Sequence, residues 1–216
     1  MGDLVSGRYP DFEEEWLFDG QPLPPYRRSL NRRDIAIAAG VGIPATTKML
    51  VTAVPCQPGD VFGYVTFGVV TAGTQTSSAF VVVYSAVPTS SAAATVLGVS
   101  ATFTATAGAN KIALTAPVSL SPTEYTPQGA GAAGTSLGSG PIVLGVGICL
   151  SYSAGTPTLD GSASGAAYAG LLTGQVPISI ISSSTIASPP AVGSSSGTTW
   201  TTTGGGSVPY VVLSRQ

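Results

Sequence analysis

Alternation of hydrophobic and polar residues predicts strands along most of residues 35–216. In residues 61–71, Val65, Phe67 and Val69 fall on one side of an extended chain, and more polar residues fall between them. A period of two residues is typical of a strand with one buried face. We therefore expect a strand here, with these three side chains in the core.

Two other segments show related patterns. Residues 95–106 alternate Val, Ala and Phe with Ser and Thr, whereas residues 142–150 place Gly145, Gly147 and Cys149 between large aliphatic residues. Glycine in a strand allows another part of the chain to approach closely. We expect strand 142–150 to carry bulk on one side and to be closely approached on the other. Further strands are expected at 47–54, 79–86, 111–118, 177–181 and 208–213, and residues 166–172 fit either a strand or a short helix.

Turn signals separate these strands, the clearest being Pro58–Asp60, Ala107–Asn110 and Asp160–Gly161. Short strands at this spacing predict an antiparallel sandwich or barrel. No part of residues 35–216 has a sustained helical period, which argues against a parallel α/β fold.

Residues 1–34 differ from the rest of the chain. They hold two thirds of the charged residues, several aromatic residues and the prolines Pro22, Pro24 and Pro25. Proline blocks a continuous helix, although one helical turn over Asp11–Phe18 remains compatible. We expect an extended arm at 1–34. A solvated tail is the alternative, and the aromatic residues favour an arm that docks on a partner.

Two segments interrupt the strand rhythm within the expected β domain, 35–216. Residues 125–141 and 182–207 are rich in Gly and Ser and are too long for ordinary hairpin loops. These segments are expected to be either flexible loop tips or strands that form when the protein assembles. Thr198–Thr203, around Trp200, could add one strand.

Composition removes several classes of function. The chain has no His, which excludes Ser-His-Asp and Cys-His catalysis and any zinc site with a histidine ligand. Eight Lys and Arg against ten Asp and Glu leave no basic surface for nucleic acid. No glycine loop has the Lys-Ser/Thr that a phosphate site requires. We expect no cofactor and no metal.

The remaining candidates for catalysis are few. Asp60, Glu124 and Asp160 each fall near a turn or loop, where a lone carboxylate is normally solvated. A hydrolase using Asp160 or Glu124 is therefore a minor hypothesis. A Ser–Lys dyad using Lys48 or Lys111 is weaker still, because serine is abundant throughout the chain. We expect the protein not to be an enzyme.

Other side chains that could carry function have simpler interpretations. Cys56 and Cys149 are expected to be buried thiols that behave as small apolar residues. Aromatic residues that could be exposed and could stack on a neutral sugar are Tyr64, Tyr152, Tyr168, Trp200 and Tyr210. Closure of the core or of a subunit interface is the favoured interpretation of these rings. Trp200 is the candidate glycan contact.

No apolar run approaches the length needed to span a membrane. The first residues carry acidic groups where a signal peptide would need an apolar core. We therefore expect synthesis in a cytoplasm without export. A surface with so little charge is poorly protected against association, which favours a structural protein held in an oligomer.

Four features of the sequence resemble a known family. They are the Val/Thr/Ala/Gly-rich strands, the Gly-Ser loops, "LGVGICLSYSAGTPTLDGSAS" at 144–164 and "VPYVVLSRQ" at 208–216. They resemble the β-sandwich surface proteins of tailed bacteriophages of actinobacterial hosts, which include minor capsid, decoration, head-fibre and minor tail proteins. The resemblance covers residues 45–216 and includes no catalytic motif. It implies a jelly-roll-like domain, often trimeric, on the surface of a virion.

Under this resemblance the arm would anchor the protein to the major capsid protein or to tail subunits. Aromatic side chains would fill pockets on the shell and arginines would pair with acidic groups there. The expected docking residues are Phe12, Trp16, Phe18, Tyr26, Arg27, Arg28, Arg32 and Arg33. The alternative is a lectin-like tail or head-fibre module that binds a glycan of the host cell wall.

Overall fold

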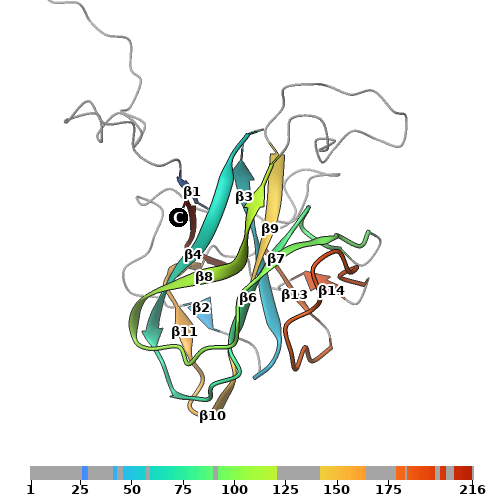
Figure 1. The fold of residues 1–216 in the computed structure, drawn as a ribbon. Coiled ribbons are helices and arrows are strands. Elements are labelled where there is room, and N and C mark those ends of the chain that lie inside the picture. Colours follow the sequence, from blue (N-terminus) through green and yellow to red (C-terminus); the bar gives the residue numbers. More distant parts are fainter. Residues whose placement is uncertain are drawn as a thin grey trace, which may run out of the picture.

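The computed structural model describes residues 26–28, 41–42, 46–56, 59–89, 92–120, 142–163, 179–182, 184–197, 200–202 and 207–215. These residues form strands, turns and bends, with no helix among them. The strand pairs are antiparallel throughout both large sheets (Figure 1). The expected all-β, antiparallel class is confirmed. None of the described residues belongs to a helix that could cross a membrane.

One six-stranded sheet, sheet A, has the order β1-β16-β4-β11-β2, and β8 pairs with the other side of β4. Its strands are β1 (Tyr26–Arg28), β2 (Val41–Gly42), β4 (Val61–Thr71), β8 (Gly108–Ser119), β11 (Thr158–Leu159) and β16 (Val211–Ser214). The strand expected at 61–71 is thus confirmed as β4. The first and last described strands of the chain, β1 and β16, lie side by side.

The second six-stranded sheet, sheet B, has the order β14-β13-β3-β9-β6-β7. Its strands are β3 (Met49–Cys56), β6 (Phe80–Tyr84), β7 (Val96–Val99), β9 (Ile142–Cys149), β13 (Ser179–Ser182) and β14 (Trp200–Thr202). Two small sheets complete the described structure. They pair β5 (Thr74–Gln75) with β10 (Tyr152–Ala154), and β12 (Gly161–Ala163) with β15 (Ser207–Pro209).

Sheets A and B share one apolar core. Val65, Phe67 and Val69 of β4 are buried in it, as expected from their alternation. Leu144 and Ile148 of β9 contribute from sheet B. Each such side chain stabilises the fold by roughly 1.5–3 kcal/mol relative to exposure. The period-two pattern in the sequence therefore identifies the residues on the side of each sheet that faces the other sheet.

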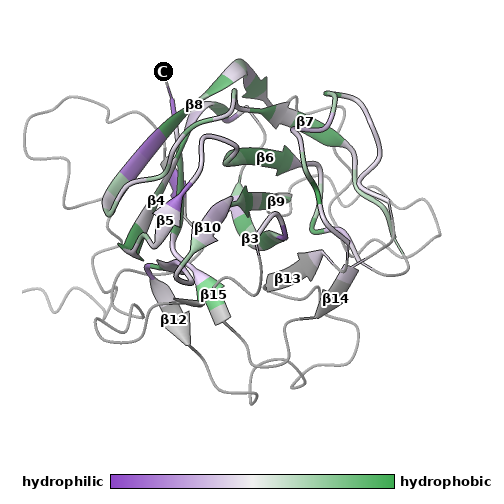
Figure 2. Ribbon diagram, turned by 90° about the horizontal axis from the view of Figure 1, so that it is seen from below, coloured by the Kyte–Doolittle hydropathy of each residue, from purple (hydrophilic) through white to green (hydrophobic). Residues whose placement is uncertain are grey.

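Sheet B also buries its other face. A second cluster contains Met49 of β3, Phe80 and Tyr84 of β6, Cys149 of β9 and Trp200 of β14. Figure 2 shows β6 coloured mainly as hydrophobic along its length, whereas β8 of sheet A alternates hydrophobic and hydrophilic segments. All five residues of β6 are buried, while β8 is largely exposed on one side.

The second cluster is covered by residues 184–197, here called the cover segment. Ile186 packs against the cluster, and its N–H donates to the Thr47 carbonyl at 2.8 Å. The Gly193 N–H donates to the Val96 carbonyl at 2.8 Å, and the Val96 N–H donates to the Ser194 carbonyl at 2.9 Å. This part of the expected Gly/Ser-rich segment 182–207 therefore contacts sheet B through backbone hydrogen bonds and Ile186.

The glycines of β9 make this second face flat. A Cβ atom added at Gly145 would lie 2.5 Å from the Ala86 carbonyl oxygen, and one at Gly147 would contact Met49 Sδ. The close approach predicted for this side of strand 142–150 is confirmed. Any larger residue at Gly145 must displace backbone, because the carbonyl it meets cannot rotate away alone.

The strand expected at 95–106 ends early, at Val99. The Ser100 hydroxyl accepts a hydrogen bond from the Val81 N–H at 3.0 Å and donates to the Ala101 carbonyl at 2.7 Å. The Ser100 N–H still donates to the Val81 carbonyl at 3.0 Å, and Phe103 pairs with Ala79 one residue out of the β6–β7 register. The chain therefore stays beside β6 but no longer forms a regular strand. Ala101 is exposed, whereas Phe103 packs half-buried against the shared core and Ala105 is buried in it. The predicted inward direction is therefore wrong for Ala101 and confirmed for Phe103 and Ala105.

Candidate functional site

The candidate site is the place where the N-terminal segment joins the sheets. Arg27 in β1 pairs with Leu213 in β16, and Leu213 is fully buried in the shared core. Directly paired residues of antiparallel strands point to the same side of the sheet. Arg27 therefore projects toward sheet B, and β1 also contacts β3 of that sheet. We call Arg27, Asp60, Cys56 and Leu213 the N-terminal junction.

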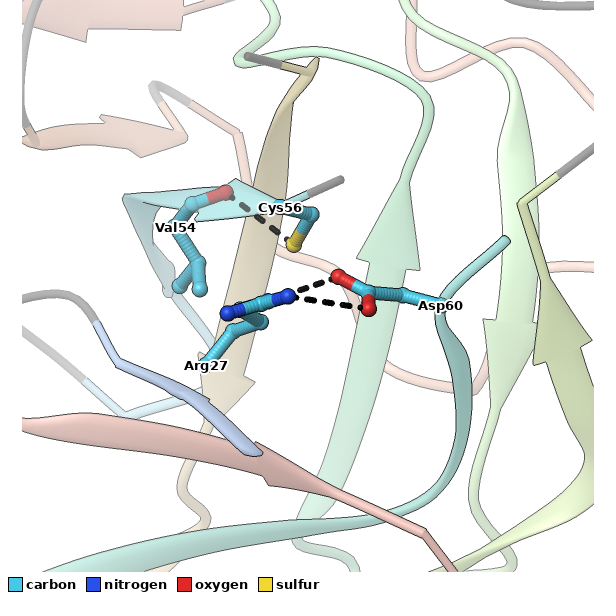
Figure 3. Close-up of polar contacts among 4 residues, drawn as sticks. All are labelled: Arg27, Val54, Cys56 and Asp60. Carbon is cyan, nitrogen blue, oxygen red and sulfur yellow. Dashed lines mark hydrogen bonds and ion pairs between the residues drawn. The ribbon is translucent and has the colours of Figure 1, made fainter. Parts of the chain in front are cut away.

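The guanidinium of Arg27 forms a two-point ion pair with Asp60 (Figure 3). Its Nε lies 2.7 Å from Oδ2 and its Nη2 lies 3.1 Å from Oδ1. The exposed fractions of the two side chains are only 15% and 7%. A fork of two parallel bonds is the strong arrangement for Arg and a carboxylate. A buried carboxylate without a cation would be costly, so each group requires the other.

Backbone bonds hold Asp60 in position. The Gly59 N–H donates to the Leu120 carbonyl at 2.6 Å, and the Leu120 N–H donates to the Asp60 carbonyl at 2.8 Å. The carboxylate is thereby fixed at the entry to β4 and directed at Arg27. The expectation that Asp60 is a lone solvated group is wrong, because its cation comes from a distant part of the sequence.

Cys56 lies beside this pair at the end of β3. Its thiol donates to the Val54 carbonyl at 3.4 Å (Figure 3). Burial raises the pKa of Cys56 well above its usual range; the Asp60 charge raises it further, and the Arg27 charge opposes this. The thiol therefore stays protonated and unreactive at neutral pH.

The expectation of buried, unbridged thiols is confirmed for both cysteines. Cys149 belongs to the second cluster, and burial raises its pKa to about 12. Its thiol donates to the Ile186 carbonyl of the cover segment at 3.5 Å. The two thiols thus report on two different regions of the molecule.

The expected docking residues are only partly within the described structure. Tyr26, Arg27 and Arg28 form β1, so this part of the expected arm 1–34 is a strand of sheet A. Arg27 was expected to pair with acidic groups of another protein, and the structure pairs it with Asp60 of this chain. The other expected docking residues, Phe12, Trp16, Phe18, Arg32 and Arg33, lie outside the described residues, and their roles stay predictions.

Trp200 is not available as a sugar-stacking surface. Its exposed fraction is 4%, and its ring packs edge-on against Tyr84 with the centroids 6.0 Å apart. Its Nε1–H donates to the Gly197 carbonyl at 3.1 Å. The ring closes the second cluster, in agreement with the favoured interpretation that such a ring closes the core. The short strand expected around it is confirmed as β14.

The remaining candidates for chemistry are dispersed. Asp160 is half-buried, with its side chain over Gly68. The Lys111 amine lies 4.2 Å from the centre of the Tyr64 ring on sheet A. No group of three or more His, Cys, Asp or Glu side chains suited to a metal occurs among the described residues. Glu124 and Tyr168 lie outside those residues, so the catalytic hypotheses stay untested.

The arrangement at the N-terminal junction is thus suited to attachment. It fixes an extended segment to the edge of a sheet by backbone pairing and one buried ion pair. No known protein family matches the chain, and a comparison with curated proteins finds no relative.

Proposed function

We propose that the protein is a structural component of a virion, a capsid decoration or minor capsid protein. Its N-terminal segment anchors it to the major capsid protein or to tail subunits, and its β domain, a jelly-roll-like sandwich, faces outward. The domain forms a homo-oligomer, with a trimer as the expected state. The proposal rests first on the likeness of residues 45–216 to phage surface proteins.

One observation of the fold supports this proposal most directly. The charged N-terminal segment enters the body through β1, which is held by β16 and by the Arg27–Asp60 pair. A pulling force on residues 1–25 would therefore act on a strand of sheet A and not on a loop. An anchoring segment needs such a connection, whereas a solvated tail does not.

The body fits an outward-facing structural domain. Sheet B contributes buried apolar side chains on both faces, and both thiols are buried. Few charged groups occur outside residues 1–34. Such a surface favours association over life as a free monomer.

Co-sedimentation with particles tests the proposal. Full-length protein, a chain lacking residues 1–25 and a chain lacking residues 1–34 are each mixed with virions stripped of this protein. We expect only the full-length protein to sediment with the particles. The shorter deletion keeps Arg27, so it removes the anchor and leaves the junction intact. Undiminished binding of the 26–216 chain would overturn the anchoring role.

A further inference from the structure

β1 has the features of a bound peptide. It is three residues long, and the twelve residues 29–40 separate it from β2. Its backbone extends the edge of sheet A at β16, and its central side chain enters the body to meet Asp60. Backbone pairing at a sheet edge combined with an alternate side chain in a pocket is how sheets recognise extended peptides.

The site that receives β1 is built without it. The edge comes from β16, the carboxylate from the start of β4, and the wall from Val54 and Cys56 of β3. Asp60 is fixed by its backbone bonds to Leu120. The two carboxylate oxygens present a fork that fits a guanidinium better than an ammonium. The site therefore selects an extended segment with arginine at its centre.

We propose that in the oligomer this site receives Tyr26–Arg28 of a second copy of the chain. Thirteen residue steps, from residue 28 to residue 41, can span at most on the order of 40 Å, and this length sets the reach that exchange requires. Exchange of an identical element between copies preserves every bond that the element makes, so it is a low-cost route to an oligomer. This inference rests on the homo-oligomer of the proposed function.

The strand register supplies the test. Tyr26 lies opposite Ser214, and Cα atoms of such pairs lie within disulfide range. The variants Tyr26→Cys and Ser214→Cys are co-expressed as separate full-length chains, oxidised with diamide and run on a denaturing, non-reducing gel. Exchange predicts a covalent dimer containing one chain of each kind, because neither chain can close this bond alone.

Two controls set the background. Tyr26→Cys is also co-expressed with Ser119→Cys, whose position at the far end of β8 is exposed and pairs with Val61 instead. Arg27→Ala added to the Tyr26→Cys chain removes the ion pair. We expect both controls to reduce the dimer at least tenfold.

The double variant Tyr26→Cys/Ser214→Cys in one chain decides the outcome. Exchange gives covalently linked oligomers, whereas pairing within each copy gives an internally closed monomer and overturns the proposal. Absence of any disulfide would overturn it as well, because the β1–β16 register would then be wrong. Particle binding by the wild-type protein is measured separately. A linked dimer without particle binding would refute the virion role and leave the exchange intact.

Discussion

Two segments remote in sequence are attached to the sheets in opposite ways. At the N-terminal junction, β1 is held by three backbone-paired residues and one buried ion pair. The cover segment, 184–197, is held on sheet B by uncharged groups, through backbone hydrogen bonds to Thr47, Ala94 and Val96 and apolar packing around Trp200. The first attachment adds one charged pair to its backbone bonds, whereas the second uses several uncharged contacts.

This difference has consequences for how each region can fail. Removal of one group at the junction breaks the buried ion pair, so a single substitution weakens the attachment of β1. Loss of one hydrogen bond in the cover segment leaves the others in place. An attachment that depends on one specific ion pair suits a segment that transmits load or changes partner. An attachment made of several uncharged contacts suits a segment that stays in place.

The largest effect is expected from Trp200→Ala, which removes the ring that closes the second cluster. Deletion of a buried Trp side chain typically costs about 3–5 kcal/mol of unfolding free energy. Chemical denaturation measures the loss. Val192→Ala is the control, because Val192 is 57% exposed in the cover segment that precedes β14 and should change stability by less than about 0.5 kcal/mol. Equal effects of the two variants would contradict the role of the Trp200 ring in closing the second cluster.

Arg27→Ala should destabilise the protein by about 2–3 kcal/mol. Breaking a deeply buried pair costs about 3–5 kcal/mol, and departure of β1 lets water reach Asp60, which lowers the cost. Arg215→Ala, at an exposed residue after β16, should have an effect within about 0.5 kcal/mol. If the two arginine variants were equally stable, the junction would not be an energetic attachment.

The two buried thiols separate the regions directly. In the Arg27→Ala protein, alkylation of Cys56 should accelerate at least tenfold, because each ~1.4 kcal/mol lost from the closed state raises the open population tenfold. The rate at Cys149 should stay unchanged, since that thiol lies under the cover segment. Peptide mass spectrometry measures both rates in one sample. Parallel acceleration at both cysteines would indicate global unfolding and contradict an independent junction.

The smallest effect is expected from Tyr84→Phe. The hydroxyl donates to Met49 Sδ at 3.2 Å, and its loss should cost about 0.5–1 kcal/mol at neutral pH. Burial raises the pKa of Tyr84 above its usual 10.0, with a further contribution from Cys149. The unfolded chain therefore ionises first, and stability is retained below pH 10 and lost as the pH rises above it. Tyr84→Phe should weaken this alkaline loss in denaturation measured from pH 7 to pH 11; an identical pH profile would contradict it.

The parts of the fold that follow from local pattern were predictable. β4 has the expected bounds and the expected inward residues because alternation reports a face of a two-layer core. The flat side of β9 followed from its glycines. The regular strand ends at Val99, because the Ser100 hydroxyl accepts the Val81 N–H that a continued ladder would bond to a backbone carbonyl. Phe103 and Ala105 beyond it still face the core.

The candidate site was not predictable from sequence, for a physical reason. Asp60 and Arg27 are 33 residues apart, and no spacing rule connects a carboxylate in a turn with a cation in a charged N-terminal segment. The cover segment was missed because it packs through backbone groups and small side chains, which leave no hydrophobic period.

A double-mutant cycle on Arg27 and Asp60 tests the central claim most directly. Unfolding free energies are measured for the wild type, Arg27→Ala, Asp60→Ala and the double variant, by denaturation under identical conditions. The account predicts a coupling energy of at least about 1.5 kcal/mol, as for a hydrogen-bonded pair of charged groups. A coupling energy below about 0.5 kcal/mol would show that the two residues act independently, and the N-terminal segment would then not be fastened to the body through this pair.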